Sequence, residues 1–172
     1  KEQIQVRIGA IYALEQIALD YPSEYLRIVV NILSAFVKET SWPSKTKVPA
    51  SEEESPKRTP TDIQAALDVV PKIIEVASAT EKQNNLNEVQ VDFSRSYLKF
   101  AGLNHRNLEK AYLWHTDLSK AYLEKAELLE ADLWGAKLIK ANLRKAVLHK
   151  AKMGKVDLTG ADLRETDLTN AN

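Results

Sequence analysis

Ala131–Gly135 reads ADLWG, Ala141–Lys145 reads ANLRK and Ala161–Glu165 reads ADLRE. These segments repeat one five-residue pattern, whose central position is apolar sixteen times in register. A period of five fits neither the 3.6-residue turn of an α-helix nor the alternation of a strand, so the repeat predicts a coil that turns a corner every five residues. The central residues are Phe93, Leu98, Leu103, Leu108, Leu113, Leu118, Leu123, Leu128, Leu133, Leu138, Leu143, Leu148, Met153, Leu158, Leu163 and Leu168.

The position two residues before each centre is the second regular feature of the repeat. If the central residue is numbered i, position i−2 is alanine in ten repeats and Ser, Thr or Val in most others. A larger side chain there would compete with the central leucine for a narrow interior. Arg106 is the single departure from this rule. We therefore expect either a bulge at Arg106 or a preceding segment that reaches its guanidinium, because a buried unpaired charge is costly.

The pattern A-[D/N]-L-x-x resembles that of the pentapeptide-repeat family over residues 91–172. The resemblance implies a right-handed quadrilateral β-helix, in which four pentapeptides form one square coil and positions i and i−2 point inward. Sixteen repeats then give about four coils, stacked at a strand spacing of roughly 4.8 Å. It also implies that residues 20 apart lie on the same face of neighbouring coils.

The first half of the chain has helical periodicity instead. Apolar residues recur near every 3.6 residues over 2–20 and 23–39, and Tyr21-Pro22-Ser23 separates the two segments, which predicts an antiparallel hairpin. These helices resemble the helical segment that precedes pentapeptide repeats in some bacterial, notably cyanobacterial, proteins. Relatives with that segment often carry transmembrane helices upstream. No such span occurs in this chain, so we expect a cytoplasmic protein, with membrane tethering left open for a longer chain.

A third helix is predicted over 62–79. Thr61 and Gln64 have the spacing of a capping box, and Pro71 should kink or restart the helix. An open β-helix end exposes apolar interior and unpaired strand edges, so this helix should cap the first coil. The C-terminal coil is then open, capped by something outside this chain, or paired end to end in a dimer. The expected α+β organisation is a helical hairpin over 1–39, a loop or linker over 40–60, a helix and N-terminal cap over 61–90, and the β-helix over 91–172.

Composition restricts the classes of function. The chain has no cysteine, which excludes disulfides and thiolate metal sites, and it carries 24 basic and 24 acidic residues. The balance is 10 basic and 13 acidic residues over 1–90, and 14 basic and 11 acidic residues over 91–172. A protein that binds nucleic acid through bulk charge is normally basic, so nucleic acid is disfavoured as a partner.

Two surfaces of the repeat are candidate sites. The first contains Tyr112, Trp114 and Trp134, because Trp114 and Trp134 are 20 residues apart and should stack on one face beside Tyr112. Large aromatic residues on a surface are typical of a partner site, although the helical segment or linker could cover them, or they could simply be exposed. The second is a basic patch, interpreted either as a solvated mixed-charge face with Glu124 and Glu165 or as an anion or nucleic-acid site. It consists of Lys120, Lys140, Lys125, Lys145, Arg144 and Arg164.

No catalytic constellation is predicted. His105, His115 and His149 fall on three different faces, and the remaining acidic candidates, Asp157 and its neighbours at the same repeat position, should only support the turns. No phosphate-binding glycine motif occurs, so we expect no enzyme activity, cofactor or metal.

Two functions remain. The first is a non-catalytic interaction scaffold for an unidentified protein partner. The second is a DNA mimic that acts on a type II topoisomerase such as gyrase, as the family resemblance allows. That activity depends on a strongly acidic rod, and the positive repeat region disfavours it.

Overall fold

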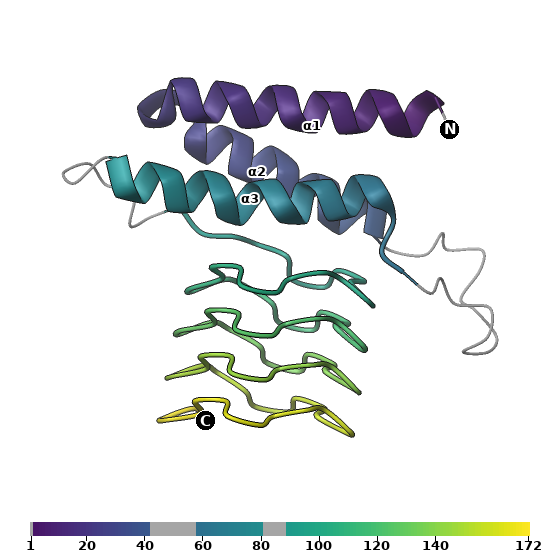
Figure 1. Ribbon diagram of the computed structural model, residues 1–172, viewed down its shortest axis with the longest axis vertical. Helices are drawn as coiled ribbons and strands as arrows, with labels where there is room; N and C mark the ends of the chain where they lie inside the picture. Colours follow the sequence, from purple (N-terminus) through teal and green to yellow (C-terminus); the bar gives the residue numbers. More distant parts are fainter. Residues whose placement is uncertain (1, 42–57, 81–88) are drawn as a thin grey trace.

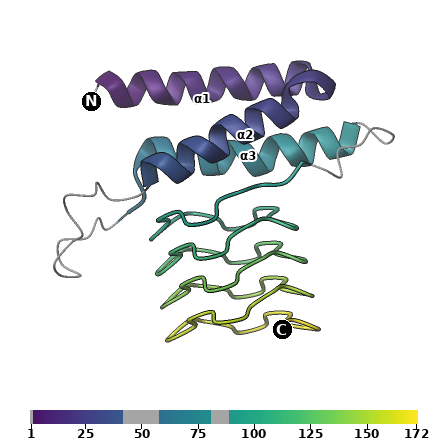
Figure 2. The same cartoon turned by 180° about the vertical axis from the view of Figure 1, so that it is seen from behind.

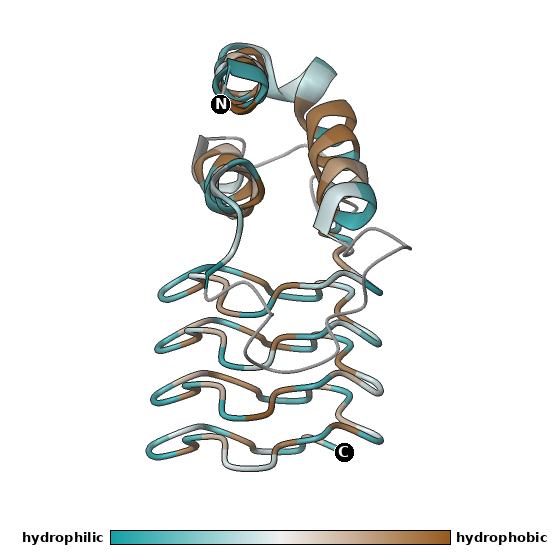
Figure 3. Cartoon of the chain, turned by 90° about the vertical axis from the view of Figure 1, so that its right-hand side faces the viewer, coloured by the Kyte–Doolittle hydropathy of each residue, from teal (hydrophilic) through white to brown (hydrophobic). Residues whose placement is uncertain are grey.

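The computed structural model describes residues 2–41, 58–80 and 89–172, which form three helices stacked on a four-coil solenoid (Figure 1). The helices are α1 (Glu2–Asp20), α2 (Pro22–Ser41) and α3 (Thr61–Thr80). Helices α2 and α3 lie side by side on the first coil, and α1 lies over them on the side away from the solenoid (Figures 1 and 3).

Parallel backbone pairing between coils builds the solenoid. Each β-bridge joins residues 20 apart, for example Asp92 to Tyr112 and Tyr112 to Asp132. Each coil both donates hydrogen bonds to its neighbour and accepts them from it. The Phe93 N–H donates to the Tyr112 carbonyl at 2.9 Å, and the Tyr112 N–H donates to the Val91 carbonyl at 2.8 Å. The architecture is therefore a parallel β-helix with four pentapeptides per coil, preceded by a helical part. Its right-handed sense stays a prediction from the family resemblance.

The interior of the coils follows the repeat as predicted. In the first three coils, the central leucines and the alanines at i−2 are all at most 1% exposed, as with Leu123 at 0% and Ala121 at 1%. Each fully buried leucine side chain contributes about 1.5–3 kcal/mol through removal of apolar surface from water. Stacked columns of leucine and alanine thus replace the layered core of an ordinary domain.

Every corner of the solenoid is a β-turn with a left-handed residue. The N–H of each i−2 residue donates to the carbonyl of the preceding central residue, as Ala126 does to Leu123 at 3.1 Å. Position i+2 has a φ between 55° and 68°, and glycine occupies it only at Gly135 and Gly160. The left-handed conformation costs a non-glycine residue roughly 1–2 kcal/mol. Coil-to-coil hydrogen bonds oppose that cost, since the i+2 N–H also donates along the ladder, as from Lys125 to the Arg144 carbonyl at 2.9 Å.

The helices cover the open edge of the first coil with side-chain hydrogen bonds. The Gln64 amide pairs with both backbone groups of Gly102, donating to its carbonyl at 2.8 Å and accepting from its N–H at 2.9 Å. Ser41 accepts from the Tyr97 N–H at 3.0 Å, and Thr59 donates to the Lys99 carbonyl at 3.0 Å. Side chains thus take the place that a preceding coil would occupy.

Ion pairs add to this contact. Lys38 of α2 lies 2.7 Å from Asp92 of the first coil. Arg106, the one large residue at i−2, lies half-buried with its guanidinium 2.7 Å from Asp68 of α3. The turn at Arg106 keeps its hydrogen bond to the Leu103 carbonyl at 3.3 Å, so α3 reaches the guanidinium and the coil does not bulge.

Several details of the helices differ from expectation. Gln64 does not complete a capping box, because its amide is bonded to Gly102, and the Asp62 carboxylate accepts from the Ile63 N–H at 3.1 Å. Helix α3 runs through Pro71 without restarting. Helix α2 continues to Ser41, two residues past the predicted end. Most of the predicted 40–60 linker lies outside the described residues.

The fourth coil is less covered than the others. Leu168 is 39% exposed, and Met153, Leu158 and Leu163 are only half-buried. No further coil of the described chain pairs with this one. An end-to-end dimer through this coil stays a prediction.

The corner geometry predicts a specific response to substitution at Lys125, where φ is 56°. We expect Lys125→Val to be less stable than Lys125→Gly by about 1 kcal/mol, because a β-branched side chain is strained at positive φ. Both variants remove the same charge. Urea denaturation measures the difference in the free energy of unfolding, and equal stability of the two variants would contradict the proposed strain.

The cap predicts a second response. We expect Gln64→Leu to lower the free energy of unfolding by about 1–3 kcal/mol, because it leaves the Gly102 N–H and carbonyl without partners. Amide exchange at Gly102 should accelerate in the same variant. The matched control is Gln16→Leu on the exposed side of α1, which should change stability by less than about 0.5 kcal/mol. Unchanged exchange at Gly102 would exclude this role of Gln64.

Candidate functional site

The candidate partner surface, here called the aromatic face, lies on the side of the solenoid where Asp92 of the first coil binds Lys38 of α2, the helix drawn in front of α3 in Figure 2. Tyr112 stands at the outward i−1 position and is 38% exposed. Trp114 and Trp134 occupy the i+1 position of successive coils, with Trp134 44% exposed and Trp114 half-buried. The structure therefore brings the three predicted residues onto one face, on backbone that the coil ladder holds rigid.

Glycines make room for the rings on this face. A Cβ atom at Gly154 would lie 2.1 Å from Cζ3 of Trp134, so the indole rests directly on the Gly154 backbone of the next coil. The imidazole of His115 rests on Gly135 in the same way, because a Cβ atom there would lie 2.6 Å from Nδ1. The rings of Trp134 and His115 thus rest on the backbone of the next coil.

Cations and a second ring hold the indoles in place. The Arg95 guanidinium lies 4.5 Å from the centroid of Trp114, and the Lys155 ammonium lies 5.4 Å from that of Trp134. Trp114 also packs edge-on against His115 at 5.9 Å. The predicted stack therefore takes another form, in which each indole has its own cation and Trp114 pairs with His115.

The helical part does not bury this face. The described contacts of α2 and α3 with the solenoid go to first-coil residues such as Asp92, Tyr97 and Gly102. Burial opposes ionisation of Asp92, but hydrogen bonds from Lys38 and Ser94 outweigh it and hold the pKa of this carboxyl below its ordinary value. Asp92 stands directly above Tyr112 in the ladder. The contact between α2 and the solenoid therefore ends where the exposed aromatic surface begins.

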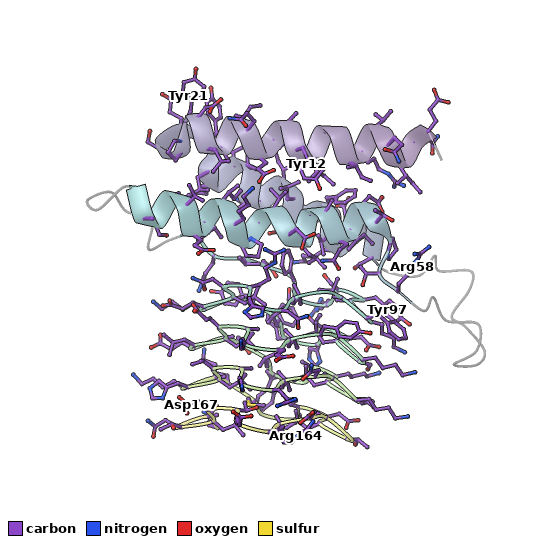
Figure 4. The ribbon with its side chains drawn as sticks, viewed as in Figure 1. Tyr12, Tyr21, Arg58, Tyr97, Arg164 and Asp167 are labelled. Carbon is purple, nitrogen blue, oxygen red and sulfur yellow. The ribbon has the colours of Figure 1, made fainter. Side chains whose placement is uncertain are left out.

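The predicted basic patch occupies the opposite side, together with neighbouring acidic residues. Glu165 lies 3.4 Å from Arg144 and 3.5 Å from Lys145, while Arg164 is paired with Asp162. Lys120 lies over the ring of Phe100 at 5.5 Å, Lys140 packs beside Gly160, and Lys125 stands on the next corner, while Arg164 lies on the last coil (Figure 4). This surface carries both signs of charge, and its role stays a prediction.

The carboxylates at i−1 support their own turns. Asp157, Asp162 and Asp167 each accept a hydrogen bond from the backbone N–H two residues later, at 3.0, 3.2 and 2.9 Å. The Arg164 side chain lowers the pKa of Asp162 to about 2, and hydroxyl hydrogen bonds lower the pKa of the other two. All three are ionised at neutral pH, so they are unsuited to act as general acids.

Within the described residues, no three His, Asp or Glu side chains gather closely enough to hold a metal ion. His105 and His115 occupy different corners, and His149 lies on a separate face at an i+1 position. Among the same residues, no helix is both long and apolar enough to cross a bilayer.

Sequence reasoning missed the residues that join the helices to the solenoid. Lys38 and Gln64 lie in predicted helices and Ser41 in the predicted 40–60 linker, and none of these patterns shows a sign of a contact with the repeat. Only Arg106 gave a signal, because its size conflicts with an interior position. The contacts depend on where the helices lie in space, which no local pattern reports.

Comparison with known proteins bears on the repeat. Residues 107–172 match the family model described as pentapeptide repeats (8 copies), in overlapping matches over 107–144, 126–164 and 141–172. Residues 107–172 of the chain are thus similar to pentapeptide repeats. No curated protein has a sequence that matches this chain.

Solved structures of other pentapeptide repeat proteins are similar to it. One from the Arabidopsis thaliana thylakoid lumen is 30% identical with a TM-score of 0.39, over 48% of this chain and 61% of that one. HetL from the cyanobacterium Nostoc, involved in heterocyst differentiation regulation, is 34% identical with a TM-score of 0.29, over 45% and 38%. A third, also from Nostoc, is 36% identical with a TM-score of 0.26, over 41% and 62%. This chain spans less than two thirds of each.

The contact between the Trp134 ring and the Gly154 backbone leads to a prediction for Gly154→Ala. We expect the added methyl group to displace the Trp134 indole and to lower the free energy of unfolding by about 1–3 kcal/mol through overpacking. The NMR signal of the Trp134 indole N–H should shift. Gly9→Ala is the control, since nothing lies within 4 Å of its Cβ position, and it should not move that signal. An unmoved Trp134 signal in Gly154→Ala would mean that the indole does not rest on the backbone.

Proposed function

We propose that this chain, whose residues 107–172 are similar to pentapeptide repeats, is a non-catalytic scaffold that binds a protein partner through its aromatic face. The observation that carries the proposal is the half-exposure of Trp134 and Tyr112 on a rigid coil. Trp and Tyr are enriched among the residues that dominate binding energy at interfaces. They also lose little conformational entropy on binding, because they have few rotatable bonds.

The geometry favours a protein over a small molecule. Trp134 and Tyr112 stand on the outer surface of the solenoid and are 44% and 38% exposed, whereas small-molecule sites are concave. The cations Arg95 and Lys155 lie over the indole rings, so the face combines apolar and charged groups as protein interfaces do. These features support a partner with an apolar centre and polar surroundings.

The DNA-mimic alternative has less support. An imitation of DNA requires a regular array of negative charge, but residues 91–172 carry 14 basic and 11 acidic side chains. The mixed-charge face around Glu165 supports neither a DNA mimic nor a nucleic-acid site.

Affinity capture from cells of the source organism tests the proposal. We expect Trp114→Ala combined with Trp134→Ala to reduce recovery of the partner by about 30-fold, the size of an interface hot-spot effect. Quantitative mass spectrometry measures the recovery, and thermal unfolding checks that the variant is folded.

The matched control is Tyr122→Ala, which removes an aromatic side chain that is 51% exposed on the opposite face. It should leave recovery unchanged. Equal recovery by the wild-type protein, the double Trp variant and the control would reject the aromatic face as the binding surface.

A further inference from the structure

Helix α2 carries a second apolar surface besides its core side, here called the outward stripe. Its residues are spaced by four, three, four and three positions, and the first four are 58%, 40%, 51% and 47% exposed. The rings of the first two meet edge-on with centroids 6.3 Å apart, so the stripe is contiguous. The outward stripe consists of Tyr21, in the turn just before α2, and of Tyr25, Ile28, Ile32 and Ala35 of α2.

The core side of α2 is already satisfied. Leu26, Val30 and Leu33 are at most 1% exposed and pack beneath α1 and α3. The outward stripe is therefore not needed to hold α2 in the molecule. Figure 3 shows α2 end-on, with one side free of α1, α3 and the solenoid. Contiguous apolar surface of this kind marks an interaction site.

The spacing of the stripe indicates what it binds. When two helices pack at a shallow crossing angle, the residues of each helix that face the other are spaced alternately by three and four positions. An extended peptide or a globular surface would not require that spacing over two full heptads. The occupant is therefore a helix with its own apolar stripe.

We propose that this helix is α2 of a second copy of the chain, packed antiparallel about a two-fold axis. In the register that best matches side-chain sizes, Ile28 faces Ile32 of the second copy and Tyr25 faces Ala35 of the second copy. In these two layers a tyrosine meets an alanine and the isoleucines meet each other, whereas Tyr21 comes opposite Glu39 of the second copy. A two-fold axis repeats each contact, so one stripe supplies both halves of the interface.

The polar flank of the stripe is self-complementary in the same register. Glu24 comes opposite Lys38 of the second copy, and Asn31 comes opposite its own counterpart. The Lys38 ammonium already binds Asp92 at 2.7 Å, but its side chain is 34% exposed and an ammonium has three donors. Lys38 can therefore bind a second carboxylate without releasing the first.

A membrane surface fits the stripe less well. Helices that lie in the membrane interface carry lysine and arginine beside their apolar side. The exposed residues beside this stripe carry both signs of charge, Arg27 as well as Glu24 and Glu39, so the stripe lacks the uniformly basic flank that anionic lipid headgroups would bind. The charge on the flank thus favours a partner with a cation at a defined position, as the second copy has.

The absence of cysteine from the chain allows a direct test of the register. The proposal expects a disulfide-linked dimer when Tyr25→Cys protein is mixed with Ala35→Cys protein under mild oxidation. Each variant oxidised alone should form little disulfide-linked dimer, because its two cysteines then lie several turns apart in the dimer. Non-reducing electrophoresis gives the readout. Absence of the mixed species, or equal cross-linking of each variant alone, overturns the proposed register.

Analytical ultracentrifugation tests the dimer itself. We expect Ile28→Asp combined with Ile32→Asp to raise the dissociation constant of the dimer about 100-fold or more. The control is Val6→Asp on α1, where Val6 is 67% exposed outside the stripe, and it should leave the dimer intact. A wild-type chain that stays monomeric up to about 1 mM overturns the proposal and assigns the stripe to a helix of another protein. Neither readout involves the aromatic face.

Discussion

The coil-to-coil backbone ladder is the interaction on which the rest of the structure depends. It pairs each residue with the one 20 positions later, as between Tyr122 and Asn142, and so sets the register of every column. The leucine and alanine columns are continuous only because that register is kept. The strained corners survive for the same reason, since the ladder and the turn hydrogen bond together determine the backbone at each left-handed residue.

The ladder also creates the need for a cap. A parallel coil presents unpaired N–H and carbonyl groups at each end, and these groups cost free energy when a protein surface covers them without partners. Here α2 and α3 supply partners from side chains, with the Gln64 amide reproducing the donor and acceptor of a peptide group. The cap thus satisfies the edge while joining two folds that have different periods.

The same rigidity gives the aromatic face its character. The Trp134 indole lies on glycine backbone and both indoles lie under cations, so these rings lose little freedom when a partner arrives. The polar columns differ. The carboxylates of Asp162 and its equivalents already accept hydrogen bonds from their own turns, and Glu165 neutralises the positive charge around Arg144. Surface chemistry on this solenoid is therefore decided column by column, and the aromatic columns are the ones with exposed apolar surface.

Sequence alone determined the repeat and its period of five. The family resemblance supplied the coil of four pentapeptides, and the two together put Tyr112, Trp114 and Trp134 on one face. The sequence also located the three helices to within two residues from their apolar periodicity. Only the tertiary structure decided how Gln64 is used, that α3 reaches Arg106, and that Ile28 and Ile32 of α2 remain exposed. Those outcomes depend on how helices of one period are laid against coils of another. Local sequence patterns report an element's own geometry, whereas the contacts between unlike elements are set by their relative placement in space.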